Sequence, residues 1–423
     1  SLYDFENRKP LFEAVDSRAR FCLLTLAGRD FREHEAAFAF FAHEPADLDR
    51  PGVKFTLTPD EITLLNPNTG TCPIFRNRRD AEITLAIYRR APVLVEEGDS
   101  DGNPWGVKFT TMFHMSNDSY LFHTRDELED QGWTLCGNAF SRGGETMLPL
   151  FQGMMADLYN HRAADVVRSE SAEKRQNQPR YLTDQDRSDP ERLAMPQYWV
   201  SSTEVPPLPD WLIGFSDITS ATNERTMVAY PLPPVATGNK IPLVMSDLPS
   251  SKRAVLLAMM SSYVFDFVAR QKVSGTTLNF FLVKQFSALA PKLFDLPCPW
   301  NRRQTTEAWL VRRVSELVYT AVDMKSFADS IGLQSEPFKW DPLRRSQLRA
   351  ELDAAFFVLY GISREDADYI MDSFPIVRRK DEAKHGDYRT KLLILKIFDA
   401  ISEAERTGAP YGSSIDRSLS SKG

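Results

Sequence analysis

Residues 250–268 read Ser-Ser-Lys-Arg-Ala-Val-Leu-Leu-Ala-Met-Met-Ser-Ser-Tyr-Val-Phe-Asp-Phe-Val, and this stretch determines the class of structure expected in the C-terminal half. Two serines precede the apolar run, and hydroxyl residues are preferred at helix starts. The apolar, aromatic and methionine positions between 255 and 268 have a spacing that buries one side of a helix. We therefore predict a helical segment whose apolar side chains belong to the core.

The sequence downstream continues in the same manner. Further helices are predicted near residues 305–331, 342–360, 363–372 and 387–405. Gly332 and Gly361 stand where helices should end, because glycine readily adopts the left-handed conformation that terminates many helices. Residues 300–405 are thus predicted to form a helical C-terminal domain, and residues 406–423 a flexible, solvated tail.

The sequence upstream of residue 100 mixes strand-like and helix-like patterns. Apolar runs at 19–27 and 36–42 suit buried strands, and their closeness predicts that they pair as a hairpin. Residues 1–50 therefore have the pattern of the end of a mixed sheet and not of a complete domain. Residues 51–100 are predicted to be a Pro-rich connector with a helical stretch that begins at Thr58-Pro59-Asp60-Glu61 and continues over 78–88.

Between residues 101 and 245 the helical period is lost, and aromatic residues, Gly, Pro and short β-rich runs dominate. A charged stretch at 168–192 is predicted to be an exposed loop. The fold class expected for the whole chain is α+β. An irregular, mainly β domain over 101–290 is predicted to lie between the N-terminal strands and the helical domain.

Composition narrows the functional classes. The chain has 423 residues, 42% hydrophobic residues and a net charge of −7. That charge disfavours a non-specific nucleic-acid binder, although specific binding requires only a local basic face. No apolar run approaches the ~18–20 residues that span a bilayer. The four cysteines are widely spaced, which favours free thiols in the cytoplasm over a zinc site.

Several sequence boxes resemble a known family. The first is Tyr3-Asp4-Phe5-Glu6-Asn7-Arg8-Lys9, followed by Val15-Asp16-Ser17 and Phe21-Cys22-Leu23-Leu24-Thr25-Leu26. The second is Leu148-Pro149-Leu150-Phe151-Gln152-Gly153-Met154-Met155 with Tyr159-Asn160-His161-Arg162. The third comprises Trp211, Phe215, Asp217-Ile218-Thr219, Asn223 and Arg225-Thr226, and the fourth runs from Leu256 to Gly275. The last includes Arg349-Ala350-Glu351-Leu352-Asp353-Ala354, Leu359-Tyr360-Gly361, Phe374-Pro375-Ile376-Val377 and Tyr388-Arg389-Thr390.

In this order the boxes resemble the C-terminal part of type IIG-like and phage-defence adenine-N6 DNA methyltransferases. The resemblance implies that residues 1–50 are the last strands of a methyltransferase sheet and that 101–290 are a target-recognition domain. Three positions depart from the family pattern. Gln152 and Met154 replace a Glu and a Lys, and Ser216 replaces an Arg. These changes remove charges from boxes that the resemblance assigns to DNA recognition.

The residues that methyl transfer requires are not found in the sequence. The Gly-rich turn that binds S-adenosylmethionine and the Asp/Asn-Pro-Pro-aromatic tetrapeptide that holds the flipped adenine have no counterpart here. The pairs Pro206-Pro207 and Pro233-Pro234 lack the polar and aromatic flanks. No nuclease-type carboxylate–lysine motif or metal-ligand spacing is recognised either. We therefore predict no catalytic, cofactor or metal site in this chain, with S-adenosylmethionine bound elsewhere in the parent enzyme.

Ten side chains are predicted to contact DNA because their types suit base edges and phosphates. They are Gln152, Asn160, His161, Arg162, Asn223, Arg225, Thr226, Arg142, Arg270 and Lys272. Simpler alternatives exist for most of them. His161 and Arg162 also suit the end of a helix through 154–159, and residues 222–226 suit a polar turn between strands. The basic residues of 174–180 suit a solvated loop, and those of 378–391 suit an ordinary amphipathic helix face.

The predicted function is sequence-specific recognition of double-stranded DNA on behalf of an adenine methyltransferase in restriction–modification or phage defence. Its expected partners are the DNA and the catalytic methyltransferase domain, with a nuclease or helicase as a further candidate. The alternative is a protein-interaction module that docks a partner subunit through its acidic surface and binds no DNA alone. A DNA-mimicking inhibitor is a third interpretation, suggested only by the net charge.

Overall fold

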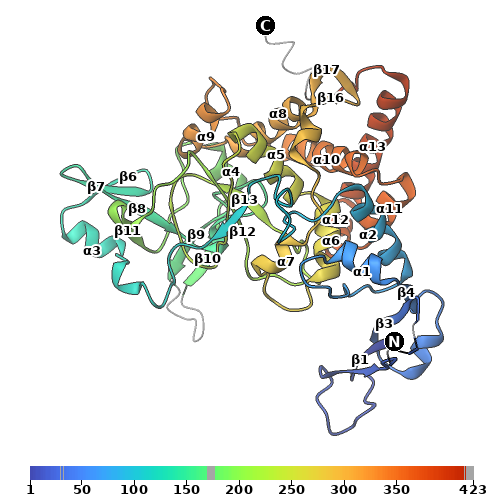
Figure 1. Ribbon diagram of the computed structural model, residues 1–423. Coiled ribbons are helices and arrows are strands. Elements are labelled where there is room, and N and C mark those ends of the chain that lie inside the picture. Colours follow the sequence, from blue (N-terminus) through green and yellow to red (C-terminus); the bar gives the residue numbers. More distant parts are fainter. Residues whose placement is uncertain (29, 32, 169–176, 414, 416–423) are drawn as a thin grey trace.

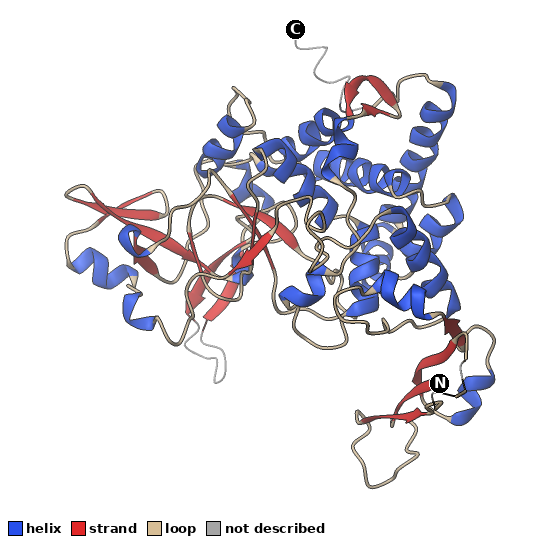
Figure 2. Cartoon of the chain, in the orientation of Figure 1, coloured by secondary structure: helices blue, strands red, loops and turns tan. Residues whose placement is uncertain are grey.

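The computed structural model describes residues 1–28, 30, 31, 33–168, 177–413 and 415 of the chain. Figure 2 shows most helices gathered on one side of the molecule and most strands on the other. A small N-terminal sheet extends away from the helical side (Figure 1). The chain is therefore an α+β protein, as its sequence predicts.

The stretch quoted from 250–268 is helical but is divided into two helices. α5 (Ser250–Met260) ends at Ser261, and α6 (Tyr263–Lys272) begins after Ser262, whose hydroxyl accepts a hydrogen bond from the Phe265 amide at 3.3 Å. The apolar residues of α5 from Ala254 onward are fully buried. A helix that is apolar on every side belongs in the middle of a core, and α5 packs between α8 (Thr306–Val318) and the mainly β part.

The other predicted helices are confirmed. They are α8, α9 (Lys325–Ser330), α10 (Pro342–Leu359), α11 (Arg364–Asp372) and α13 (Arg389–Thr407). Gly332 and Gly361 have φ angles of 74° and 69°, as predicted for residues that end helices. α12 (Pro375–His385) carries the basic residues 378–380, whereas Arg389 and Lys391 belong to α13, so the basic residues of 378–391 are helical but divided between two helices.

The N-terminal sheet differs from the predicted hairpin. Its strands are β1 (Leu2–Glu6), β2 (Arg20–Leu24), β3 (Ala36–Ala42) and β4 (Phe55–Leu57), in the order β2-β1-β3-β4. The prediction that the two apolar strands pair is wrong, because β1 lies between them, antiparallel to β2 and parallel to β3. β3 is largely buried, whereas β2 is a mostly exposed edge strand and not the buried strand that its composition predicts.

Residues 51–100 contribute to the core and are more than a connector. α1 (Pro59–Leu65) begins as predicted, with the Thr58 hydroxyl accepting from the Glu61 amide and the Glu61 carboxylate accepting from the Thr58 amide. This reciprocal arrangement is a capping box. α2 (Arg78–Arg90) buries Ile83, Ile87 and Tyr88 in the same cluster of apolar side chains as α5 and α6.

The region from 101 to 245 is irregular and mainly β, as predicted. One sheet has the order β11-β8-β7-β6, with β14 pairing β8, and a second has the order β13-β12-β15-β5. The first sheet contains β6 (Thr134–Cys136), β7 (Ala139–Arg142), β8 (Glu145–Phe151), β11 (Trp199–Ser201) and β14 (Ala236–Thr237). The second contains β5 (Lys108–Thr110), β12 (Leu212–Phe215), β13 (Ala229–Leu232) and β15 (Leu243–Met245). Short helices α3 (Arg125–Asp130) and α4 (Asp184–Ser188) lie between strands.

The predicted exposed loop at 168–192 is partly structured. Residues 169–176, which include the basic Lys174 and Arg175, lie outside the described residues. β9 (Ala164–Arg168) and β10 (Asn177–Tyr181) form an antiparallel pair, and α4 follows. A loop prediction for 177–188 is therefore wrong.

The predicted domain boundary near residue 290 is not a break in the core. α7 (Phe280–Lys284), β16 (Pro297–Cys298) and β17 (Asn301–Thr305) join the two halves, and Phe286, Phe294 and Trp300 are buried in the shared core. Part of the predicted tail is also packed. The Tyr411 amide donates to the Trp300 carbonyl at 2.8 Å, and the buried Ser413 hydroxyl donates to Glu351 Oε1 at 2.6 Å. Residues 414 and 416–423 lie outside the described part. No helix in the described part is long and apolar enough to cross a membrane.

Candidate functional site

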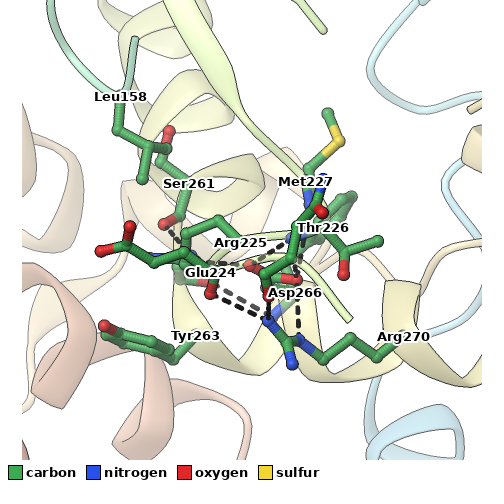
Figure 3. Close-up of polar contacts among 12 residues, drawn as sticks. Leu158, Glu224, Arg225, Thr226, Met227, Ser261, Tyr263, Asp266 and Arg270 are labelled. Carbon is green, nitrogen blue, oxygen red and sulfur yellow. Dashed lines mark hydrogen bonds and ion pairs between the residues drawn. The ribbon is translucent and has the colours of Figure 1, made fainter. Parts of the chain in front are cut away.

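A buried carboxylate, Asp266 of α6, organises the segment that contains three of the predicted DNA contacts (Figure 3). Asp266 accepts hydrogen bonds from Arg225 Nε and from the amides of Thr226 and Met227, at 3.0 and 3.4 Å for the two amides. Arg225 also donates to the Ser261 carbonyl at 2.7 Å, and its guanidinium lies 4.1 Å from the centre of the Tyr263 ring. Burial lowers the pKa of Arg225, but the nearby carboxylates prevail and the net direction is upward.

Arg270, one helical turn after Asp266, holds the same segment from the other side. Its Nη2 donates to the carbonyls of Asn223 and Glu224 at 2.6 and 2.8 Å (Figure 3). Its guanidinium also stacks on Phe374, 4.0 Å from the ring centre. Residues 220–226, called the fastened turn below, are thus tied to α6 through both their backbone and their side chains. The turn interpretation of this segment is confirmed.

This arrangement corrects three predicted DNA contacts. The side chains of Arg225 and Arg270 are less than a tenth exposed, and Thr226 is fully buried. Their donors are directed to partners inside the protein, so they position the fastened turn and are not available to a phosphate or a base. The Asn223 side chain, by contrast, lies on the exposed side of the turn.

The segment Asn160-His161-Arg162 is also buried. Arg162 donates to four backbone carbonyls, those of Arg187, Asp189 and Arg192 at 2.7–2.9 Å and that of Thr320 at 2.5 Å. His161 Nε2 lies 2.8 Å from Asp323 Oδ1. These three predicted contacts are therefore interior residues, and His161 and Arg162 join the mainly β part to the helical part.

The alternative interpretation of this segment is wrong as well. Met154–Tyr159 does not form a helix, because only a single 3-10 turn at Gly153–Met155 precedes an irregular chain in which Tyr159 has a φ angle of 56°. His161 and Arg162 consequently cap no helix there. No local sequence pattern predicts the clamp that the four carbonyls form around Arg162, because the acceptor residues lie 25–158 positions away in the sequence.

Lys272 is a further correction. Its ammonium donates to the carbonyls of Leu65 and Gln285 and to Asn66 Oδ1, and the side chain is buried. Removal from water lowers the pKa of Lys272 well below its usual value. The lysine joins the end of α1 to α6 and is not available to DNA.

Arg142 is located where a DNA contact is feasible. It ends β7 and precedes Gly143 and Gly144, whose φ angles of 59° and 91° form the β7–β8 turn. This hairpin lies at the outer edge of the mainly β part (Figure 1). The Arg142 side chain is partly exposed while its Nη1 donates to the Gln131 carbonyl at 2.7 Å and its guanidinium stacks on Trp133.

Gln152 lies in a groove that two of the sequence boxes form together. The groove, called the central groove below, has a volume of about 340 Å³. Its lining residues are Met115, Gln152, Gly153, Met154, Ser216, Ile218, Gly238 and Lys240. Gln152 and Met154 follow β8, whereas Ser216 and Ile218 follow β12, so the fold brings together segments that are some 60 residues apart.

Gln152, Met154 and Ser216, the three positions that depart from the pattern the sequence was expected to follow, all line this groove, and we take it as the candidate functional site. Lys240 Nζ lies 2.6 Å from Asp217 Oδ2, and the lysine side chain is 52% exposed. Ile218 is 66% exposed. The buried Nε2 of Gln152 has no hydrogen-bond partner among the described residues.

The sequence analysis did not identify Met115, Gly238 and Lys240 as site residues. Met115 lies in the chain after β5, whereas Gly238 and Lys240 lie in the loop between β14 and β15, and no local spacing marks them. The role of Asp266 was not predicted either. A single carboxylate within the apolar stretch 263–268 nevertheless indicates a buried ion pair.

Several basic side chains of α12 and α13 are paired with carboxylates of the chain. Arg378 pairs with Glu382 at 2.7 Å, Lys380 pairs with Glu224, and Lys391 lies 2.9 Å from Asp368 and Asp372. Between 101 and 245, acidic residues outnumber basic ones by as much as the net charge of −7 of the whole chain. The charge excess therefore lies in the part that contains the central groove.

Comparison with known proteins gives no relative: no protein-family model, no curated protein and no solved structure matches this chain. Among the described residues, no group of three or more His, Cys, Asp or Glu side chains is arranged to hold a metal ion.

Proposed function

We propose that this chain is the DNA-recognition part of an S-adenosylmethionine-dependent adenine-N6 DNA methyltransferase that acts in restriction–modification or phage defence. The observation that carries the proposal is the central groove. Two boxes that resemble the recognition region of this family, separated in sequence by β9–β11, meet there with Gln152 and Lys240. Glutamine is a side chain that reads base edges.

Two further structural elements support the proposal, the fastened turn and the β7–β8 hairpin. The fastened turn presents Asn223 on a backbone held by Asp266 and Arg270, and the β7–β8 hairpin presents Arg142 beside two exposed glycines. Recognition is more accurate when reading groups stand on ordered elements. The proposed DNA contacts are therefore Arg142, Gln152 and Asn223.

The proposed partner is a methyltransferase catalytic domain that supplies the cofactor site and the adenine pocket. Support comes from β2, the edge strand of the N-terminal sheet. Leu23 and Leu24 point to opposite faces of that sheet, and both are more than half exposed. A strand that is apolar on both faces is typical of the interior of a sheet covered on both sides. We propose that residues 1–50 complete such a sheet with strands of the catalytic domain, in the cytoplasm of a bacterial cell.

Selection from a random duplex pool tests the recognition role. The purified chain is bound to the pool over a salt series, and the retained DNA is sequenced. We expect enrichment of one short adenine-containing motif and an affinity that falls as salt rises. Gln152→Ala and Asn223→Ala should weaken or blur the motif, whereas Gln185→Ala on the exposed side of α4 should leave it unchanged.

A second candidate function is docking of a partner protein without independent DNA binding. The acidic excess of the mainly β part favours it, because negative charge repels phosphates and attracts a basic partner. No retention of duplex DNA at low salt, by the chain alone, would exclude independent recognition. Retention that appears only when a catalytic or nuclease partner is added would support this second function.

A further inference from the structure

The central groove is a concavity, and its shape restricts what it can hold. Side chains that read paired bases have to project from a protein into a groove of DNA. The central groove instead recedes between the chain after β8 and the chain after β12. A group that binds in the central groove therefore has to protrude from the molecule to which it belongs. A base within a duplex does not do so, whereas a base that has left the stack does.

The size and walls of the groove suit a flat heteroaromatic ring. Met115, Met154 and Ile218 supply apolar surface, and methionine side chains adapt to the shape of an occupant. Gly153 and Gly238 add no side chains of their own. A Cβ at Gly238 would lie 3.0 Å from Met115 Sδ, so a larger residue there would displace Met115 and change the shape of the groove.

The charges in the groove favour a neutral occupant over a phosphate. Lys240 is the basic residue of the lining, and its ammonium is already paired with Asp217 at 2.6 Å. A neutral base needs hydrogen-bonding groups and no net charge. Gln152 and Ser216 supply such groups, and glutamine forms two hydrogen bonds with the edge of adenine.

We propose that the central groove binds a single adenine base that is unstacked from the bound DNA, with Gln152 on its polar edge. This proposal rests on the proposed function, because it requires that the chain binds DNA. It adds that recognition includes capture of an extrahelical base by this chain itself, separate from the base that the catalytic domain methylates.

Binding of three labelled duplexes of equal length and flanking sequence tests this proposal. The first is fully paired, the second has one bulged adenine, and the third has a bulged abasic site. We expect the bulged adenine to bind at least about tenfold more tightly than the paired duplex, because the protein no longer has to unpair and unstack a base. The abasic bulge should not share this preference, since it bends the duplex but offers no base.

Two groove variants locate the effect. Gln152→Ala should reduce the preference for the bulged adenine by about three- to tenfold, as expected for loss of one or two hydrogen bonds. Gly238→Leu should abolish the preference for the bulged adenine, because the larger side chain displaces Met115 and fills the groove. Gln185→Ala is the matched control and should retain the full preference. Circular dichroism of each variant verifies that it is folded.

The outcomes separate the two proposals. If none of the three duplexes binds at any salt concentration, the proposed function itself fails. If all three bind equally, the chain binds DNA but the groove captures no base. Equal preference for the adenine and abasic bulges, or a preference that survives in both groove variants, would also overturn base capture at this groove.

Discussion

Replacement of Asp266 by alanine tests whether the fastened turn depends on one buried carboxylate. In the structure this carboxylate accepts from Arg225 Nε and from the amides of Thr226 and Met227, and it is fully buried (Figure 3). Its removal leaves the buried guanidinium of Arg225 without its counter-ion. Arg270, whose Nε lies 3.6 Å from the carboxylate, also loses a compensating charge.

The expected decrease in the free energy of unfolding is large. Removal of one partner from a buried ion pair destabilises a protein by about 3–5 kcal/mol, because the remaining charge is left uncompensated. Each amide that loses its acceptor in the interior adds about 1–3 kcal/mol. We therefore expect Asp266→Ala to lower the free energy of unfolding by at least about 3 kcal/mol, a substantial part of the roughly 5–15 kcal/mol by which domains are stable.

Urea unfolding followed by tryptophan fluorescence measures this change, and amide hydrogen exchange locates it. The amides of Thr226 and Met227 should exchange faster in the variant, because they lose their acceptor. Glu403→Ala is the control, since Glu403 pairs with Arg406 at the exposed surface, where solvent screens the pair. An Asp266→Ala protein that loses less than about 1 kcal/mol, like the control, would refute the assignment of Asp266 as the fastening group.

Three further predictions concern buried charged groups. Arg162→Met should lower the free energy of unfolding by about 3 kcal/mol or more, measured in urea, because four carbonyls lose their donor; a change below about 1 kcal/mol would contradict the clamp. Burial raises the pKa of Asp353 from 3.8 to about 6. The folded state therefore binds more protons between these values, and this residue's contribution to stability should fall by about 3 kcal/mol as pH rises from about 4 to about 6. Urea midpoints from pH 4 to 7 should show a smaller decline for Asp353→Asn, and parallel curves would exclude the effect. Desolvation lowers the pKa of Lys272, so the unfolded state binds the proton more readily and the lysine's contribution to stability should rise with pH up to its ordinary value of 10.5. Unfolding of Lys272→Met between pH 7 and 10 should lack this rise, and an unchanged slope would contradict it.

Structural features that depend on residues close together in the sequence were predictable, whereas features that depend on distant residues were not. The start of α1 was identified correctly because its capping box lies within Thr58–Glu61, and Gly332 and Gly361 ended helices as predicted because φ is a local property. The apolar spacing from 255 to 268 predicted a buried helical segment, but the two serines at 261 and 262 divided it. Such local patterns also made the α+β class and the mainly β texture of 101–245 predictable.

The candidate DNA contacts were less predictable because residue type does not determine burial. Arginine and histidine are usually exposed, yet Arg162 and His161 are interior residues whose partners include Thr320 and Asp323, 158 and 162 residues away. A buried guanidinium that donates to four carbonyls replaces the hydrogen bonds that it loses with water, so its burial costs less free energy than the residue type suggests. The same holds for Lys272 and its three acceptors.

The sequence by itself determined the class of fold and most helices of the C-terminal part, since those depend on interactions between residues a few positions apart. Only the tertiary structure decided which polar residues face solvent, which strand lies beside which, and that Gln152, Ser216 and Lys240 share one groove. β1 lies between the two apolar strands because it pairs with both of them. The sequence of either apolar strand alone does not predict this arrangement. The physical reason is that burial and ion pairing are set by contacts between distant segments, which exist only after the chain has folded.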